Sequence, residues 1–416
     1  MTQSPNQGTR YVDTPAELRA LCEILGECDR LAIDTEFIRE RSFAPKLELV
    51  QVATPEGLIA VIDYAKLAGR AGDPFAEILT NPKILKIFHA ADQDLEILLG
   101  LTDARIEPVF DTQIAAGLIG FGAKQSYGAL VEATQGFRLA KGEAMTDWSI
   151  RPLTAAQLSY AMDDVRYLLA VYERLLTDLD QRGRLAWAYQ ETNVLQDSIT
   201  ATLGLRTDPR TCYQRVKGRG GLDGQQLAAL RELAAWRENE AQRRDRPRGS
   251  VLKDELLVEI ARRRPKHPSQ LKNLRGIQPR DLDRSGDELV AAVTKALALP
   301  RSEYPNPEAP LPVPDEQTLA LTDLLQAVVH SVAARESVAA SMLATNGELQ
   351  RLADAFRRGE PCQDLPVLSG WRGSLVGNDL LAVLEGRSVV AWNPETHSLV
   401  VASRAALAPA LSESPV

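Results

Sequence analysis

Residues 30–63 read RLAIDTEFIRERSFAPKLELVQVATPEGLIAVID, three apolar runs separated by two polar loops. The runs Leu31–Phe37, Leu47–Ala53 and Leu58–Asp63 have the length and composition of β-strands. The loops between them are too short for helical crossovers, so the strands are predicted to form an antiparallel meander. Helical patterns flank this segment, which indicates an α/β domain with a mixed sheet.

Asp34 and Glu36 lie two residues apart in the first of these strands. Successive side chains of a strand point to opposite faces, so these two carboxylates share a face. The preceding run Leu31–Ile33 shows no alternation, which favours a strand buried on both faces over one with a solvent-facing side. Two like charges are costly to bury without a counter-charge. Divalent cations, which prefer oxygen ligands, would supply that counter-charge.

Tyr160 and Asp164 form a second pair, four residues apart in the stretch 153–183. Helical periodicity runs through this stretch, which is predicted to form one long amphipathic helix with both residues on one face. Asp163 is the alternative to Asp164, but it points about 100° away on a helix of 3.6 residues per turn.

A further carboxylate is expected in HAADQDLEIL, residues 89–98, where a helix follows the predicted strand Ile84–Phe88. Asp92 and Asp94 are both candidates. Both lie in the first turn of the predicted helix, where a negative charge favours the helix dipole. Asp92 is the better N-cap of the two, and the local pattern leaves the choice open.

The order D-x-E, HA-x-x-x-D-L and Y-x-x-x-D resembles the three motifs of the DEDD exonuclease superfamily, in its tyrosine-bearing branch. The segment TDWSIRPLTAAQLSYAMDDVRYL is similar to the same region of the ribonuclease D family, and the resemblance covers roughly residues 10–209. It implies a ribonuclease-H-like exonuclease fold and selects Asp94 over Asp92. It also implies that Tyr160 positions the attacking water. The resemblance further implies two divalent cations, Mg²⁺ or Mn²⁺, held by Asp34, Glu36, Asp94 and Asp164.

Four other side chains in this half of the chain are candidates for contact with nucleic acid. His89 stands at a family position near the terminal nucleotide, and Phe37 is a candidate wedge against a terminal base. Trp148 and Arg151 are candidates for stacking on a base and for holding a phosphate. For each of the four residues the alternative is a role in packing the fold, and the sequence leaves both interpretations open.

The chain has 416 residues, which is enough for about three domains. We expect an exonuclease domain over 1–209, an all-α unit over 210–300, a proline-rich linker over 301–314 and a second all-α unit over 315–416. The segments RPRGSVLKDELL and LKNLRGI of the first all-α unit resemble the HRDC domain, with Ser250 as a possible helix N-cap. The second unit resembles a divergent HRDC-like module.

Charge is distributed unevenly along the chain. The net charge is −8, yet residues 210–300 hold 20 basic and 12 acidic residues, while residues 301–416 hold 8 basic and 14 acidic ones. A basic segment in an acidic protein is a candidate surface for RNA. Its alternatives are a solvated helical surface, or arginines that pair with nearby acids or dock the unit on the first domain. Two clusters stand out: Arg243, Arg244, Arg246 and Arg248, and then Arg262, Arg263, Arg264 and Lys266.

The resemblance implies a 3′–5′ exoribonuclease that releases nucleoside 5′-monophosphates from precursor tRNA and other structured RNA. A 3′–5′ DNA exonuclease and a catalytically silent RNA-binding adaptor are the alternatives. No apolar run reaches the length of a membrane span, and the first ten residues are polar. The four cysteines form no C-x-x-C pair. We therefore expect a cytoplasmic protein with reduced cysteines, acting as a monomer.

Overall fold

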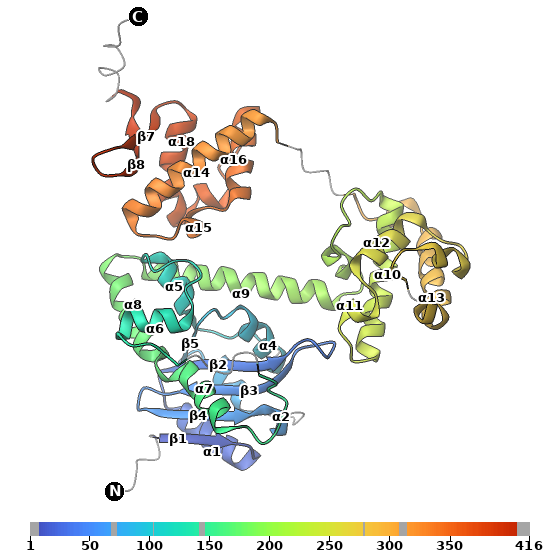
Figure 1. Cartoon of the computed structure of the whole chain (residues 1–416), viewed down its shortest axis with the longest axis horizontal. Coiled ribbons are helices and arrows are strands. Elements are labelled where there is room, and N and C mark those ends of the chain that lie inside the picture. The colour runs from blue at the N-terminus through green and yellow to red at the C-terminus, as the bar shows by residue number, and fades with distance from the viewer. Residues whose placement is uncertain are drawn as a thin grey trace, which may run out of the picture.

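The computed structural model describes residues 8–67, 73–102, 104–140, 146–277, 279–307 and 314–405. Figure 1 shows three parts: an α/β N-terminal part, a helical middle part and a C-terminal part. The long helix α9 (Leu185–Thr207) leads from the first part to the second, and the C-terminal part lies over the first. Residues 308–313 of the predicted linker lie outside the described residues.

Six strands form the sheet of the N-terminal part, in the order β1-β4-β3-β2-β5-β6. Neighbours among β2, β3 and β4 are antiparallel, which confirms the predicted meander. The pairs β1·β4, β2·β5 and β5·β6 are parallel, so the sheet is mixed, as predicted. The strands are β1 (Gly8–Val12), β2 (Arg30–Ile38), β3 (Lys46–Ala53), β4 (Leu58–Asp63), β5 (Leu85–Phe88) and β6 (Val109–Asp111).

One face of this sheet carries the carboxylates of β2. Asp34 pairs with Gln51 and Glu36 with Leu49 across the β2–β3 ladder, and paired side chains share a face. The helix α7 (Ala155–Arg166) lies across β2, β3 and β4 on this side. Apolar side chains of β3, β4 and α7 fill the space between them, among them Leu49 and Val61. The sheet and α7 thus enclose the side chains of Asp34 and Glu36.

Helices α1, α3, α5, α6 and α7 of the N-terminal part begin with a side-chain cap. Thr14 caps the first helix: its hydroxyl accepts from the Glu17 N–H, and the Glu17 carboxylate accepts from the Thr14 N–H. The helices are α1 (Pro15–Leu25), α2 (Tyr64–Leu67), α3 (Pro74–Thr80), α4 (Asp92–Thr102), α5 (Thr112–Leu118), α6 (Tyr127–Gln135), α7 (Ala155–Arg166), α8 (Leu168–Gln181) and α9 (Leu185–Thr207).

The single helix predicted over 153–183 is wrong, because α7 and α8 are separated at Tyr167. The hydroxyl of Tyr127, on α6, accepts a hydrogen bond from the Tyr167 N–H (3.2 Å) and donates one to the Asp163 carbonyl (3.1 Å). Those two backbone groups would otherwise bond each other in a continuous helix. A side chain inserted into the ladder in this way breaks a helix whose own periodicity is uninterrupted.

The middle part is helical, as predicted, and α10 packs on α12 and α13 over a core that includes Leu230, Leu257 and Val293. The expected N-cap at Ser250 is wrong. Buried Leu252 is extended, so a new helix begins only at Asp254, and the Ser250 hydroxyl donates to the Pro247 carbonyl instead. The elements are η1 (Cys212–Arg215), α10 (Gly224–Arg243), α11 (Arg248–Val251), α12 (Asp254–Arg263), η2 (Pro268–Asn273), α13 (Pro279–Leu297) and η3 (Arg301–Glu303).

The C-terminal part is helical until its end, where the all-α prediction is wrong. Two strands form an antiparallel hairpin there, because VVAW and LVVA are β-prone runs joined by the turn around residues 394–397. The elements are α14 (Glu316–Glu336), α15 (Ala340–Leu343), α16 (Asn346–Arg358), η4 (Pro366–Leu368), α17 (Gly370–Arg372), η5 (Gly373–Gly377), α18 (Asn378–Leu384), β7 (Ser388–Asn393) and β8 (Ser398–Ser403).

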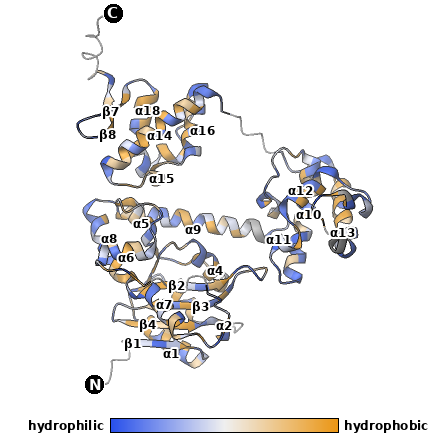
Figure 2. Cartoon of the chain, in the orientation of Figure 1, coloured by the Kyte–Doolittle hydropathy of each residue, from blue (hydrophilic) through white to orange (hydrophobic). Residues whose placement is uncertain are grey.

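The N-terminal and C-terminal parts share one hydrophobic core, to which α5, α8 and α14 contribute. Figure 2 shows hydrophobic residues along α14 and on the strands of the large sheet. The rings of Trp187 and Trp371 stack at 4.8 Å between the two parts. Arg372 donates to both carboxylate oxygens of buried Glu191, at 2.7 and 2.6 Å. The C-terminal part therefore belongs to the same folded body as the sheet.

Candidate active site

Three carboxylates converge between β2 and α7. Asp34, Glu36 and Asp164 each offer an oxygen atom, and these atoms all lie within 4.8 Å of one another. The strand period puts the first two side by side, and the packing of α7 on β2 brings in the third. Asp163, the alternative to Asp164, instead pairs with Arg166 at 2.8 Å.

Asp94 lies on the first turn of α4, beside this group but outside the 4.8 Å set. Its side chain is buried and accepts a hydrogen bond from the hydroxyl of Thr35, which stands between the two acids of β2. The charge of Asp94 contributes to the raised pKa values of Asp34 and Glu36, so the three groups are close enough to interact. Asp92, the alternative, is exposed.

All four carboxyl groups have raised pKa values, and burial is the main cause for each. The pKa of Glu36 rises to about 9, with repulsion from Asp164 and Asp94 adding to burial. The pKa of Asp164 rises to about 7 and that of Asp94 to about 6. The pKa of Asp34 lies well above its usual range. Burial and mutual repulsion disfavour the charged forms of these carboxyl groups, and a bound cation would stabilise the charged forms.

The donor set fits a hard divalent cation. Every ligand atom offered is a carboxylate oxygen, and no cysteine or histidine belongs to the group. Mg²⁺ and Mn²⁺ prefer such oxygen sites, whereas zinc is more often held by nitrogen and sulfur.

Tyr160 lies on α7 one turn before Asp164. Burial raises the pKa of its phenol, and the negative charges of Asp164, Glu36 and Asp34 raise it further. In the metal-free protein the hydroxyl is therefore protonated at neutral pH and can donate a hydrogen bond. The ring centroid of Trp148 lies 6.1 Å from that of Tyr160.

Comparison with known proteins places this geometry in a family. A 3′–5′ exonuclease family model matches residues 9–180, and an HRDC domain model matches residues 226–293. Ribonuclease D of Acidiphilium cryptum is 38% identical over 382 residues, which are 91% of this chain and 94% of that protein. Ribonuclease D of Granulibacter bethesdensis is 39% identical over 89% of this chain and 91% of that protein. The chain belongs to the ribonuclease D family.

A solved structure agrees with this assignment. The crystal structure of Escherichia coli RNase D, described as an exoribonuclease involved in structured RNA processing, matches with a TM-score of 0.77 at 30% identity. The match covers 91% of this chain and 99% of that one. As a member of the ribonuclease D family the chain is a hydrolase, a 3′–5′ exoribonuclease, and exonucleases of this type depend on divalent metal ions. No helix in the described ranges combines the length and hydropathy needed to cross a membrane.

Two of the side chains predicted to contact substrate are engaged within the ribonuclease D fold itself. Both ring nitrogens of His89 are occupied, Nδ1 by the Thr112 hydroxyl and Nε2 by the Gln125 carbonyl, each at 3.0 Å. Burial lowers the pKa of His89. Arg151 donates from Nε (2.6 Å) and Nη2 (2.7 Å) to the two oxygens of fully buried Asp63. These contacts tie loops to the sheet.

The other two predicted substrate contacts are aromatic. Trp148 is only 3% exposed and packs against Leu49 and Val61, while its Nε1 has no hydrogen-bond partner in the structure. Phe37 is half-buried, and the guanidinium of Arg39 lies 5.4 Å from its ring centroid. Of the two, only Phe37 retains surface that a base can contact.

Sequence reasoning missed Thr35, Asp63 and Tyr127, which hold the site in place. Thr35 bonds Asp94, Asp63 anchors the loop that carries Trp148, and Tyr127 ends α7 beside Asp164. Of these three residues, only Asp63 could have been identified from the sequence. It is the last residue of β4, whose other residues are all apolar, and a buried charge requires a partner. The other two are ordinary polar residues until the fold brings their partners close.

The basic clusters of the HRDC domain are largely paired within the protein. Arg243 and Arg244 both bond Glu240, and Arg262 and Arg263 both bond Glu259. Arg264 donates to the Gln225 side-chain carbonyl at 2.5 Å. These pairs reduce the charge that either cluster offers to RNA.

The loop at the end of α10 docks on the exonuclease domain. Asp245 accepts from the Lys46 ammonium at 2.7 Å and from the Phe43 N–H at 3.1 Å. Arg248 bonds Glu238, donates to the Phe43 carbonyl at 3.2 Å and lies 4.2 Å from the ring centroid of Phe43. Docking was one of the alternatives for the first cluster, and these contacts favour it for Arg248.

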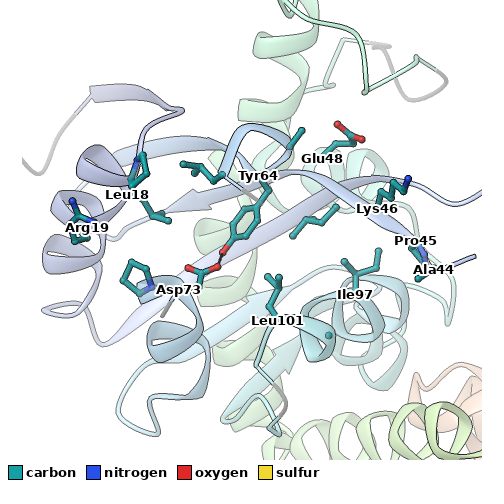
Figure 3. A pocket seen from close by; sticks show the side chains of 16 residues that line it. Leu18, Arg19, Ala44, Pro45, Lys46, Glu48, Tyr64, Asp73, Ile97 and Leu101 are labelled. Carbon is teal, nitrogen blue, oxygen red and sulfur yellow. Dashed lines mark hydrogen bonds between the residues drawn. The ribbon is translucent and has the colours of Figure 1, made fainter. Parts of the chain in front are cut away.

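A cavity of about 870 Å³ lies elsewhere in the exonuclease domain, between α1, α2, β3 and α4. Figure 3 shows Tyr64 inside it, with its hydroxyl toward Asp73, surrounded by apolar side chains such as Leu18 and Leu101. None of the four carboxylates lines this cavity. The chemistry of the site is therefore at the sheet face under α7, not in this cavity.

Proposed function

We propose that this chain trims the 3′ ends of structured RNA, including precursor tRNA, one nucleotide at a time, and releases nucleoside 5′-monophosphates. The observation that carries the proposal is the convergence of Asp34, Glu36 and Asp164 within 4.8 Å, in a member of the ribonuclease D family. A catalytically silent adaptor would have no need of three carboxylates that repel one another. We further propose that it acts as a monomer in the cytoplasm, where its four cysteines stay reduced.

Asp34, Glu36, Asp94 and Asp164 would hold two divalent cations, Mg²⁺ or Mn²⁺. When bound, these cations neutralise the scissile phosphate and lower the pKa of a water molecule. The protein holds the four carboxylates in place: Thr35 restrains Asp94, and the end of α7 at Tyr167 sets the position of Asp164. Pre-organised ligands of this kind spend little free energy on rearrangement when substrate arrives.

Tyr160 is assigned to orientation of the attacking water. Its phenol is protonated in the metal-free protein, and in this assignment it donates a hydrogen bond to the water. Phe37 follows Glu36 in β2 and is half-buried, and we assign it to contact with the terminal base.

The test is digestion of a 5′-labelled, 3′-extended tRNA precursor and of single-stranded DNA of the same 3′ sequence. Each substrate is incubated with Mg²⁺, with Mn²⁺ and with a chelator, and the products are separated. We expect stepwise shortening of the RNA, 5′-monophosphate products and no cleavage with chelator. Faster digestion of the DNA would favour a DNA exonuclease, and binding without cleavage under any metal would favour an adaptor.

A further inference from the structure

A second pocket of about 470 Å³ lies in the HRDC domain, where η1, α10, α11 and the start of α12 meet. It is separate from the carboxylate site and belongs to a different domain. Its lining is rich in charged groups of both signs. The lining residues are Cys212, Arg215, Lys217, Ala234, Arg237, Glu238, Arg248, Gly249, Lys253, Asp254 and Glu255.

Two of the three acids in this lining are already neutralised. Glu238 is bound through both oxygens by Arg248. Asp254 accepts from Arg237 at 2.7 Å and from the Lys217 N–H at 2.9 Å. Of the acidic side chains, Glu255 alone remains to offset the other cations of the pocket.

Three cations of the lining have no acidic partner among the described residues: Arg215, Lys217 and Lys253. Arg215 lines the same pocket as Arg248 and Glu238, which already bond each other. Cationic side chains thus outnumber acidic ones in this lining. An anion bound between them would relieve the repulsion.

Two features of the backbone and the buried side chains add donors. The helix α12 begins at this pocket, and its N-cap residue Lys253 makes no side-chain cap hydrogen bond. The exposed N–H groups of a first helical turn carry partial positive charge and bind anions. Arg237 is 8% exposed, lines the pocket, and its Nε atom has no hydrogen-bond partner in the structure.

We propose that this pocket binds a phosphodiester group of the RNA backbone and is the main phosphate-contact site of the HRDC domain. The proposal rests on the proposed function, because it assigns the substrate's backbone to the pocket. Its position suits that role: Arg248 touches Phe43, in the loop that follows catalytic strand β2. The pocket therefore adjoins the loop between β2 and β3.

The end of α12 is the rival site, with Arg262, Arg263 and Lys266. Those side chains have an adequate reason to be basic without RNA. Cations at a helix C-terminus favour the helix dipole, and Glu259 already pairs with the two arginines.

The test compares two full-length variants, each with three positive charges removed from one region of the HRDC domain. The pocket variant carries Arg215→Gln, Lys217→Gln and Lys253→Gln, all at exposed positions. The control variant carries Arg262→Gln, Arg263→Gln and Lys266→Gln. Binding of a 3′-extended tRNA precursor is measured in chelator, from low to high salt, so that cleavage does not interfere. Circular dichroism and Tm verify that both variants are folded.

We expect the pocket variant to bind RNA more weakly and to show a shallower dependence of log K on log salt. The slope should fall by about 0.7 to 0.9 for each RNA phosphate that the variant no longer neutralises. The control should keep a slope near that of the wild type. An unchanged slope in the pocket variant, or equal weakening in both variants, would overturn the proposal. Because binding is measured without metal, failure of the wild type to cleave RNA would count against the proposed function alone.

A second arm separates an RNA phosphodiester from free phosphate. The Tm of the wild type and of the pocket variant is measured while inorganic phosphate is titrated. A chloride salt at the same ionic strength serves as the reference. If phosphate raises the Tm of the wild type alone while RNA binding is equal in both, the pocket is a site for small anions and the RNA assignment is wrong.

Discussion

The hydroxyl of Tyr127 takes the place of the helical hydrogen bond to Tyr167. It accepts from the Tyr167 N–H at 3.2 Å and donates to the carbonyl of Asp163 at 3.1 Å, next to Asp164. This contact ends α7 and lets α8 leave in a new direction. A metal ligand is thus placed at a helix end that a side chain from another helix creates.

Tyr127→Phe should therefore lower cleavage while leaving RNA affinity nearly unchanged. Loss of the hydroxyl lets the Asp163 carbonyl and the Tyr167 N–H bond each other, which straightens the junction and moves Asp164. The free energy of unfolding should change by only about 1 kcal/mol, the usual net contribution of one hydrogen bond. Tyr304→Phe is the control, since its hydroxyl accepts from Gln225 at 3.3 Å in the HRDC domain. Equal effects of both substitutions on cleavage would contradict the prediction.

Neutral substitution of any proposed metal ligand should nearly abolish cleavage without unfolding the protein. The changes are Asp34→Asn, Glu36→Gln, Asp94→Asn and Asp164→Asn, each measured by single-turnover digestion of RNA. Their matched controls are Asp92→Asn and Asp163→Asn, which remove the same charge one or two residues away. We expect both controls to retain most of the activity. An inactive Asp92 variant beside an active Asp94 variant would reverse the assignment on α4.

Metal-free protein should lose stability as pH rises, and Glu36 should contribute to that loss. Burial and neighbouring carboxylates raise its pKa from 4.5 to about 9 in the folded state. The folded chain then holds the proton more tightly than the unfolded chain does. The stability that this bound proton contributes is fully present below pH 4.5 and is lost as pH rises through about 9.

Glu36→Gln should flatten this pH dependence and raise Tm in chelator at pH 8 to 9, as followed by circular dichroism from about pH 5 to 9. Glu23→Gln, on the exposed side of α1, is the control. Added Mg²⁺ should raise the Tm of the wild type most at high pH, because binding to the folded state alone is stabilising. A variant with the same pH slope as the wild type would show that Glu36 does not titrate in this range.

Tyr160→Phe should lower the single-turnover rate far more than the affinity for RNA. Only a hydroxyl is removed, and its role is to orient water in the transition state. The expected fall in rate is on the order of 10² to 10⁴, the scale of positioning and proton-transfer groups. A variant that cleaves at nearly the wild-type rate would mean that Tyr160 only packs against Trp148.

Arg151→Met should destabilise the exonuclease domain by about 3 to 5 kcal/mol, because it leaves the buried charge of Asp63 without its cationic partner, although the Tyr11 hydroxyl still donates to it. Arg174→Met is the control. Arg174 pairs with Asp178 on the surface of α8, and such pairs contribute about 1 kcal/mol or less. Urea unfolding measures both. Near-equal destabilisation by the two substitutions would indicate that Arg151 is free to bind substrate phosphate.

The sequence by itself determined the features that follow from local backbone geometry. The strand period put Asp34 and Glu36 on one face, helical spacing put Tyr160 and Asp164 on one face, and the short loops required an antiparallel meander. All three hold in the structure, because period and connection length are properties of neighbouring residues.

Only the tertiary structure decided which charges meet. Asp63 lies 88 residues from Arg151, and Tyr127 lies 40 residues from Tyr167, so no local pattern links them. The same reason separates the basic side chains of the HRDC domain. Those of Arg243 and Arg263 pair with glutamates on their own helices, while that of Arg215 lines a pocket without an ion pair among the described residues. A charged residue is recognisable from sequence, but its partner is chosen by packing, and the partner decides whether the charge stabilises the fold or remains available to a ligand.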